Sequence, residues 1–430
     1  MCIERNKSIA IYNKARKHIL GGVNSPFRAL GILSGERPPV AINRGNGPFV
    51  WDADGNKYID YLLSCGPLVL GHANPVVVEA IKSQTEQGTG FGSITNLELN
   101  LAELITRAYH LDKVRFVNSG TEATMSAIRL ARGFTERDKF IEFEGGYHGH
   151  SDSLLAGRSK GITVGTAKDT LIATYNDPKS VEVILNTEGK NVAAIIVEPI
   201  AGNMGLVLPN EDFLPGLRQL ADDYGIVLIF DEVLTGFRVA PGGAESIYGV
   251  KPDLVTLGKV IGGGLPVGAF GGREEIMNYI APFGPVFQAG SQAGNALGMA
   301  AGTAQLEYLL NNIKIYQRLS QTTNKLINGI YQAAEEVGIP VVAKAVGSIF
   351  SLAFYNGKIS NYQEALKLNT KMFQRWITKM LNQGIYLAQG PLEVNYLSTV
   401  HSDEQVNETI NAARDTFQEL KNEAHHLTTS

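Results

Sequence analysis

Two side chains able to take part in catalysis stand at the ends of apolar runs in the middle of this 430-residue chain. The run 225–230 leads into Asp231, and the run 253–257 leads to Lys259. Short apolar runs bounded by turn signals are typical of buried strands in a parallel sheet. The carboxyl ends of such strands face the ligand crevice, so we expect the acid and the lysine to meet in one pocket.

An acid and a lysine in one crevice match the needs of pyridoxal phosphate. The carboxylate keeps the pyridine nitrogen protonated, and the lysine carries the cofactor as a Schiff base. Less specific interpretations exist, because Asp231 followed by Glu232 also fits a magnesium site or a helix cap. A lone lysine is usually a surface charge, but Lys259 lies between an apolar run and a glycine-rich turn, which favours the cofactor.

A phosphate site is predicted in the segment 116–132. An apolar run ends at Val117, a turn follows, and helical periodicity begins at Glu122. Backbone N–H groups and the dipole of a helix start attract a phosphate, and Gly120 leaves room for close approach. An ordinary capping box at Thr121 would give the same pattern.

Tyr147, His148 and His150 follow another predicted strand. Two histidines at this spacing suggest a metal, yet no third ligand follows at the usual distance in sequence. An aromatic side chain in this position could instead stack on a planar cofactor. Residues 157–170 lack periodicity and are predicted to form a mobile loop near the mouth of the pocket.

Composition limits the classes of protein. The 44% hydrophobic content describes a chain with a sizeable core, and the formal net charge of −4 argues against general affinity for nucleic acid or anionic membranes. Cys2 and Cys65 are too few for a disulfide framework, so a reducing cytoplasm is expected. We find no apolar run long enough for a membrane helix and no secretory pattern.

The order of elements predicts an α/β protein larger than one ordinary core. Residues 1–65 are expected to form an N-terminal segment with a small β-meander around the turn at Asp54 and Gly55. Residues 66–312 are expected to form the large domain with a mostly parallel sheet. Residues 313–430 are expected to form a C-terminal α/β subdomain.

The motifs, taken in this order, resemble the class III pyridoxal-phosphate enzymes of fold type I. The likeness covers nearly the whole chain and is most specific in GGVNSPFRA, GPLVLGHANP, RFVNSGTEATMSAIRLARGFTERDK, FEGGYHGHSDSLL, VEPIAGNMG and TLGKVIGGGLPVGAFGG. It implies a large domain with a mostly parallel sheet and a smaller α/β domain formed by the N- and C-terminal segments. It also implies a homodimer with shared active sites.

The resemblance assigns roles to individual residues. It implies that Lys259 bonds to pyridoxal 5′-phosphate, that Asp231 pairs with the ring nitrogen, and that Tyr147 is the third catalytic residue. Arg28 would clamp a substrate carboxylate as a planar double donor. The other implied cofactor contacts are Ser119, Gly120, Thr121, His148, Asn203, Val233 and, from the partner subunit, Ser291; the other implied substrate contacts are Ser25, Asn203 and Glu393.

The resemblance implies an intramolecular amino transfer that converts glutamate 1-semialdehyde into 5-aminolevulinate for tetrapyrrole biosynthesis. The cofactor would alternate with its pyridoxamine 5′-phosphate form. Four features depart from the family: the loop at 157–170 is short, Cys65 stands where tryptophan is usual, the run 291–296 differs, and the stretch around Glu393 is altered. Two alternatives therefore stay open, an aminotransferase that uses a separate acceptor for another amino acid or amine, and a silent ligand-binding relative.

Overall fold

The computed structural model describes residues 3–33 and 35–429, with side chains described up to residue 423. These residues form two compact units. Unit 1 contains the residues up to 74, residues 314–359 and those from 363 onward, and unit 2 contains residues 75–313 and 360–362. The domain boundaries expected near residues 65 and 312 stay a prediction, because compactness alone does not show that a segment folds by itself.

Unit 2 is built on a seven-stranded sheet with the strand order β4-β10-β9-β8-β7-β5-β6. β10 is antiparallel to both of its neighbours, whereas the pairs from β9 to β6 are all parallel. The mostly parallel sheet confirms the expected fold class. The strands are β4 (Lys113–Val117), β5 (Lys139–Phe143), β6 (Thr170–Ala173), β7 (Val192–Val197), β8 (Val227–Asp231), β9 (Leu254–Leu257) and β10 (Gly268–Gly272).

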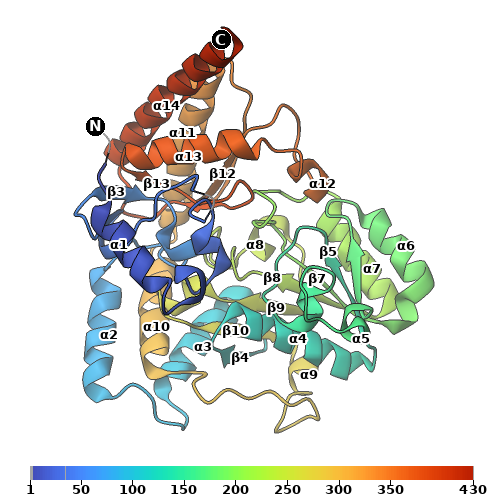
Figure 1. The fold of residues 1–430 in the computed structure, drawn as a ribbon. Helices are drawn as coiled ribbons and strands as arrows, with labels where there is room; N and C mark the ends of the chain where they lie inside the picture. Colours follow the sequence, from blue (N-terminus) through green and yellow to red (C-terminus); the bar gives the residue numbers. More distant parts are fainter. Residues whose placement is uncertain (1–2, 34, 430) are drawn as a thin grey trace. The chain divides into compact units, whose positions relative to one another are not determined.

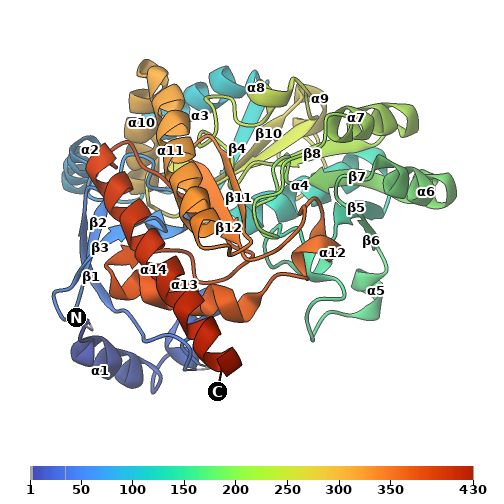
Figure 2. The ribbon, with the colours of Figure 1, turned by 90° about the horizontal axis from the view of Figure 1, so that it is seen from above.

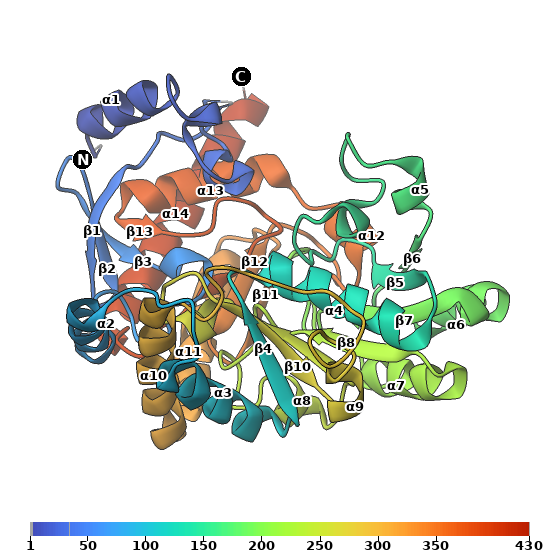
Figure 3. The ribbon, with the colours of Figure 1, turned by 90° about the horizontal axis from the view of Figure 1, so that it is seen from below.

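The helices of unit 2 cover this sheet. In Figure 1, α6 and α7 pack against each other beside β7 and β8. Helix α6 also contacts β6. In Figure 3, α10 lies alongside α2 and α3. The helices are α2 (Pro75–Gln87), α3 (Asn96–Tyr109), α4 (Gly120–Thr135), α5 (Val164–Ala167), α6 (Pro178–Glu188), α7 (Phe213–Tyr224), α8 (Glu245–Tyr248), α9 (Glu274–Met277) and α10 (Ala296–Asn311).

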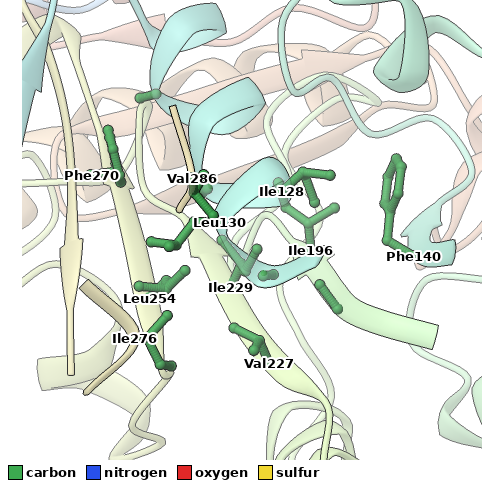
Figure 4. Close-up of a cluster of buried hydrophobic side chains, with 14 of the residues drawn as sticks. Ile128, Leu130, Phe140, Ile196, Val227, Ile229, Leu254, Phe270, Ile276 and Val286 are labelled. Atoms are coloured by element: carbon green, nitrogen blue, oxygen red, sulfur yellow. The ribbon is translucent and has the colours of Figure 1, made fainter. Parts of the chain in front are cut away.

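The central strands bury apolar side chains on both faces. Val227 and Ile229 of β8 point into a buried cluster with Ile128 and Leu130 of α4 (Figure 4). The intervening residue Leu228 is equally buried on the other face. A strand covered on both sides leaves room for functional polar groups mainly at its end. This explains why the reactive side chains gather at the carboxyl edge of the sheet.

The strand register fixes the neighbours at that edge. Asp231 pairs with Thr256 of β9, three residues before Lys259. The parallel strands β5 and β7 end at Phe143 and Val197, just before the turn to Tyr147 and just before Glu198. Parallel neighbours end at the same edge, so these segments emerge together.

The segment 157–170, expected to be a loop, holds one turn of helix, α5. Thr163 caps this turn, since its Oγ1 accepts the N–H of Thr166 at 3.2 Å. A single turn is too short to produce a periodic pattern in the sequence. The prediction of a segment without regular structure was therefore wrong at α5.

Unit 1 contains a four-stranded sheet, β1-β2-β3-β13, and a three-stranded sheet, β11-β12-β14. Helix α11 packs on β11 and on α14, and α13 also packs on α14 (Figure 2). The strands are β1 (Ile42–Asn46), β2 (Phe49–Asp52), β3 (Lys57–Asp60), β11 (Val342–Val346), β12 (Ile349–Ala353), β13 (Ile385–Tyr386) and β14 (Asn395–Tyr396). The helices of unit 1 are α1 (Asn6–Ala15), α11 (Lys314–Glu336), α13 (Thr370–Asn382) and α14 (Asp403–Thr429), whereas α12 (Tyr362–Ala365) begins in unit 2 and ends in unit 1. Within the described residues, no helix is both long and apolar enough to cross a membrane.

Candidate active site

Asp231, at the end of β8, is held by three hydrogen bonds. Its Oδ2 lies 2.7 Å from Nδ1 of His148, and its Oδ1 accepts the hydroxyl of Thr256 at 3.1 Å and the N–H of Val233 at 3.0 Å. The residue is only 4% exposed. Its carboxylate is therefore fixed in position and shielded from water.

His148 is 2% exposed, and its Nδ1 lies against the carboxylate of Asp231. Burial alone would lower the pKa of His148, but the hydrogen bond to Asp231 and the charges of Asp231, Glu198 and Glu142 outweigh it and raise the pKa. The raised pKa favours a ring that donates its Nδ1–H to Oδ2 of Asp231. The hydroxyl of Thr124 donates to the carbonyl of His148 at 2.6 Å and fixes its backbone to α4.

Glu198, directly after β7, organises two expected site residues. Its Oε1 accepts the N–H of Tyr147 at 3.0 Å, and its Oε2 accepts Nδ2 of Asn203 at 2.9 Å. Burial raises the pKa of Glu198, although the nearby charge of His148 opposes this. The carboxyl thus joins the turn before His148 to the loop after β7.

The start of α4 has the geometry of an anion site. Oγ of Ser119 accepts the N–H of Glu122 at 3.2 Å, which caps the helix, and Oγ1 of Thr121 lies 3.4 Å from Nδ1 of His150. A Cβ on Gly120 would lie 2.9 Å from Cγ1 of Val233. Glycine is therefore needed for the helix start to approach the segment after Asp231, and these contacts favour the phosphate site without excluding a simple cap.

Lys259 follows β9 in a left-handed backbone conformation, with φ of 45°. A lysine rarely adopts this conformation, and such strain is concentrated at functional sites. The preceding Gly258 is extended, and a Cβ there would lie 3.2 Å from Cγ1 of Val233. Lys259 is partly buried, and among the described residues its ammonium has no hydrogen-bond or ion-pair partner. These properties suit a nucleophilic amine.

The carboxylate of Asp231 could pair with the nitrogen of a pyridine ring. It is buried at the end of β8 and held in place by His148, Thr256 and Val233. A carboxylate beside the ring nitrogen would favour its protonated form. The donor set and the glycines around Val233 thus fit pyridoxal phosphate.

Four residues expected to contact the substrate or the cofactor are Ser25, Arg28, Glu393 and Ser291. Ser25, Arg28 and Glu393 belong to unit 1, so their approach to Lys259 stays a prediction. Arg28 is exposed on the turn Pro26–Ala29, and the N–H of Glu393 donates to the carbonyl of Gly390 at 3.2 Å. Ser291 is exposed in unit 2, on the segment before α10.

Glu142, Arg158 and Thr256 belong to this site although the sequence interpretation did not single them out. An Nη of Arg158 donates to a carboxylate oxygen of Glu142, which is completely buried in β5. Glu142 and Thr256 are polar residues within apolar strand runs, a pattern that could have drawn attention to them. Arg158 had no comparable signal, because its loop has no periodicity.

The structure gives no support for a metal site at the two histidines. His148 is hydrogen-bonded to Asp231, and His150 lies beside Thr121. In the part of the chain that is described, no group of three His, Cys, Asp or Glu side chains could hold a metal ion.

Comparison with known proteins places the chain in a family. Residues 33–417 match the class-III aminotransferases. The chain is 46% identical to glutamate-1-semialdehyde 2,1-aminomutase from Persephonella marina, over 97% of this chain and 100% of the relative. It is 47% identical to the protein of the same name from Alkaliphilus metalliredigens, over 97% of each chain.

Solved structures agree with this placement. An omega-transaminase from Sphaerobacter thermophilus superposes with a TM-score of 0.89 at 30% identity, covering 96% of this chain and 97% of the other. A glutamate-1-semialdehyde-aminomutase from Pseudomonas aeruginosa PAO1, in complex with PMP, has a TM-score of 0.86 at 28% identity, covering 96% and 94%. The chain belongs to the class-III aminotransferase family.

Proposed function

We propose that this chain converts glutamate 1-semialdehyde into 5-aminolevulinate, using pyridoxal 5′-phosphate and its pyridoxamine form. The observation that carries the proposal is the arrangement of Asp231, His148 and Lys259 at neighbouring strand ends of a class-III aminotransferase fold. Two relatives about as long as this chain, 46% and 47% identical to it, bear the name of this activity. The enzyme is therefore an aminomutase, an isomerase of this family.

Asp231 acts on the ring nitrogen. Bound pyridoxal phosphate supplies an electron sink for the carbon that bears the amino group. Asp231 keeps the ring nitrogen protonated, and His148 holds the aspartate in place through the 2.7 Å contact. The hydroxyl of Thr256 donates a hydrogen bond to Oδ1 of Asp231 and limits the rotation of the carboxylate.

Lys259 moves the protons. Its Nζ removes a proton from one carbon and returns it to another, so a single amine serves both halves of the rearrangement. The strained backbone at Lys259 directs the side chain from the end of β9. Val233 and Tyr147 would bound the two faces of the bound ring. Asn203, whose Nδ2 donates to Glu198, would contact the ring oxygen.

The remaining contacts hold the two ends of the bound molecules. Ser119, Gly120 and Thr121 bind the phosphate through the N–H groups at the start of α4. Arg28 binds the substrate carboxylate with Ser25 and Glu393 beside it. The loop at 157–170 closes the pocket, so that the intermediate is not lost to solvent.

We further propose that the enzyme is a cytoplasmic homodimer with shared sites. Unit 2 exposes large apolar side chains on two segments, among them Ile94 at 96% and Phe283 at 86%. Exposed apolar groups of this size are typical of subunit interfaces. Ser291, which would reach the partner's phosphate, lies on the same segment as Phe283 and Phe287.

A complementation experiment tests the sharing of sites. Inactive Lys259→Ala chains are mixed with Ser291→Ala chains under conditions of subunit exchange. Mixed dimers should regain activity, because one of the two sites then has both residues intact. Demonstrated exchange without any gain in activity would contradict the proposal.

The reaction itself is tested with glutamate 1-semialdehyde as the sole substrate. The enzyme should form 5-aminolevulinate catalytically without an added amino donor or acceptor. The likeness to an omega-transaminase makes a transaminase the second candidate. If turnover requires a separate donor and acceptor, and the semialdehyde alone is not isomerised, the transaminase is the correct assignment.

A further inference from the structure

A cavity of about 520 Å³ lies within unit 1. Its walls come from α1, from the chain between residues 22 and 42, from the turn after β3 and from the segment that begins at Tyr386. A volume of this size is typical of pockets for small molecules and far exceeds that of one water. Every lining residue belongs to unit 1, so the cavity is a feature of that unit alone.

Two arginines, Arg28 and Arg37, line this cavity. Arg37 is 4% exposed, and its Nε donates only a long hydrogen bond, 3.5 Å, to the carbonyl of Leu30. Burial lowers the pKa of Arg37; Tyr386 opposes this effect, and the charge of Arg5 adds to it. Among the described residues no carboxylate forms an ion pair with Arg37. A buried guanidinium without a counter-ion is costly, which indicates that an anion completes the site.

Asp60, the acidic residue of the cavity wall, already has hydrogen-bond partners. The carboxylate of Asp60 accepts the N–H groups of Leu62 at 2.8 Å and Leu63 at 3.2 Å, and it lies 2.7 Å from Nε2 of His72. It thereby holds the turn Leu63–Cys65, in which three successive residues have φ of 47°, 59° and 65°. The arginines therefore leave the cavity with unmatched positive charge.

Tyr386 also lines the cavity. Burial raises its pKa, and the hydroxyl interacts electrostatically with Arg37, Asp60, Cys65 and Arg28. A neutral phenol can donate a hydrogen bond to an anion but cannot serve as the counter-ion of Arg37. The rest of the wall is mainly aliphatic and aromatic, including Ile11, Val23, Phe27, Ile32, Val40 and Val50.

We propose that this cavity is a carboxylate site in which Arg37 is the buried cation, Tyr386 is a second donor and the apolar wall takes a short aliphatic chain. The ligand class is a small monocarboxylate with an aliphatic chain. Substrate and product of the proposed reaction belong to this class, so the inference deepens the proposed function by making Arg37 a residue for carboxylate specificity beside Arg28. Only that identification of the ligand rests on the proposed function.

The test uses pentanoate, which has the carboxylate and the aliphatic chain but no group that reacts with the cofactor or with Lys259. Binding to the full-length protein with cofactor is measured by calorimetry, with 1-pentanol as the uncharged control. Pentanoate should bind and pentanol should not. Arg37→Met should weaken pentanoate binding tenfold or more, since a charge-assisted pair is lost. Tyr386→Phe, which keeps the ring, should weaken it several-fold.

Two further measurements separate binding from folding and from catalysis. Without ligand, Arg37→Met should unfold at a temperature no lower than the wild type, because the substitution removes an unpaired buried charge. If Arg37→Met does not fold, the affinity of Tyr386→Phe for pentanoate tests the proposal instead. Lys259→Ala should bind pentanoate with the affinity of the wild type. This result would test the carboxylate site separately from the amino-transfer reaction. The proposal would be overturned if the wild type did not bind pentanoate, or if Arg37→Met and Tyr386→Phe bound it as tightly as the wild type. It would also be overturned if Arg37→Met kept its affinity while only Arg28→Met lost it.

Discussion

At the scale of single residues, the pairing of Asp231 with His148 decides what the site can do. A buried carboxylate that contacts an imidazole and accepts two further hydrogen bonds keeps its place. Without the imidazole, the Oδ2 of Asp231 would lose its 2.7 Å contact. His148 is therefore a positioning residue that acts through Asp231.

The substitution Asp231→Asn tests this assignment. The amide oxygen can still accept from Thr256 and Val233, so the fold should survive, but the ring nitrogen loses its anionic partner. We expect kcat to fall by about 10²-fold or more when cofactor is saturating. The isosteric Thr256→Val serves as control, because it removes one neutral donor and leaves the charge, and it should cost less than about tenfold. A loss of activity in Asp231→Asn no greater than in the control would be inconsistent with the assignment.

Gly120 gives a second residue-scale prediction. A methyl group there would meet Val233 at 2.9 Å, so Gly120→Ala should push the start of α4 away from the segment after Asp231. The dissociation constant of the cofactor, measured by absorbance titration, should rise about tenfold, the equivalent of roughly 1.4 kcal/mol. Gly165→Ala is the matched control, since the nearest atom to its Cβ is 4.0 Å away. Equal affinities of the two variants would contradict the close approach.

At the scale of elements, Arg158 joins the loop at 157–170 to β5. Its guanidinium donates to Glu142 in the strand and to the carbonyl of Gly146, which precedes Tyr147. Burial raises the pKa of Glu142, while the charges of His148 and Arg158 oppose the rise. The loop thus contributes a cation beside the buried carboxyl group of Glu142.

Removing that cation should destabilise the protein. In Arg158→Met the carboxylate of Glu142 stays buried without its partner, and the free energy of unfolding should fall by about 2 kcal/mol, less than for a fully buried pair because Arg158 is partly exposed. Denaturant unfolding measures the change. The double variant Glu142→Gln with Arg158→Met should recover most of it, because no unpaired charge remains. Additive losses in the double variant would show that the two side chains do not interact.

The elements also show what a sequence can and cannot predict here. The strands β7, β8 and β9 could be located because their apolar runs stop at Glu198, Asp231 and just before Lys259. The helix α5 was missed because one turn gives no periodicity. Arg158 was missed because its partners, Glu142 and the Gly146 carbonyl, depend on how a loop folds back, which no local pattern encodes.

Contacts between distant segments posed the same difficulty elsewhere. The sequence predicted that Asp231 and His148 would share a site through a family resemblance, but not that they would form a direct 2.7 Å contact. Arg37 gave no signal, since its burial depends on α1 and on the segment after α13 coming together around it. Long-range packing of this kind is invisible to spacing alone.

At the scale of the whole molecule, His401 makes stability depend on pH. The ring is buried in unit 1, its Nδ1 accepts from the backbone and hydroxyl of Ser398, and it stacks on Tyr61. Burial lowers the pKa of His401 to about 4, outweighing the opposing influence of Asp60. The unfolded chain therefore binds a proton at a higher pH than the folded protein does.

The stability of the protein should consequently fall as the pH is lowered from about 6.5 to about 4, by up to roughly 3 kcal/mol from this group. The contribution is fully present above the ordinary pKa of histidine and is lost on acidification. His401→Asn should flatten this part of the pH dependence of unfolding, whereas substitution of the exposed His18 by asparagine should not. An unchanged slope in His401→Asn would rule out this role.

The most direct measurement concerns Lys259, on which the whole assignment depends. The protein loaded with pyridoxal phosphate is reduced with borohydride and digested, and the peptides are analysed by mass spectrometry. The cofactor should be found on the peptide that contains Lys259, and Lys259→Ala should carry no label. A label on another lysine, or none after loading, would contradict the proposed site.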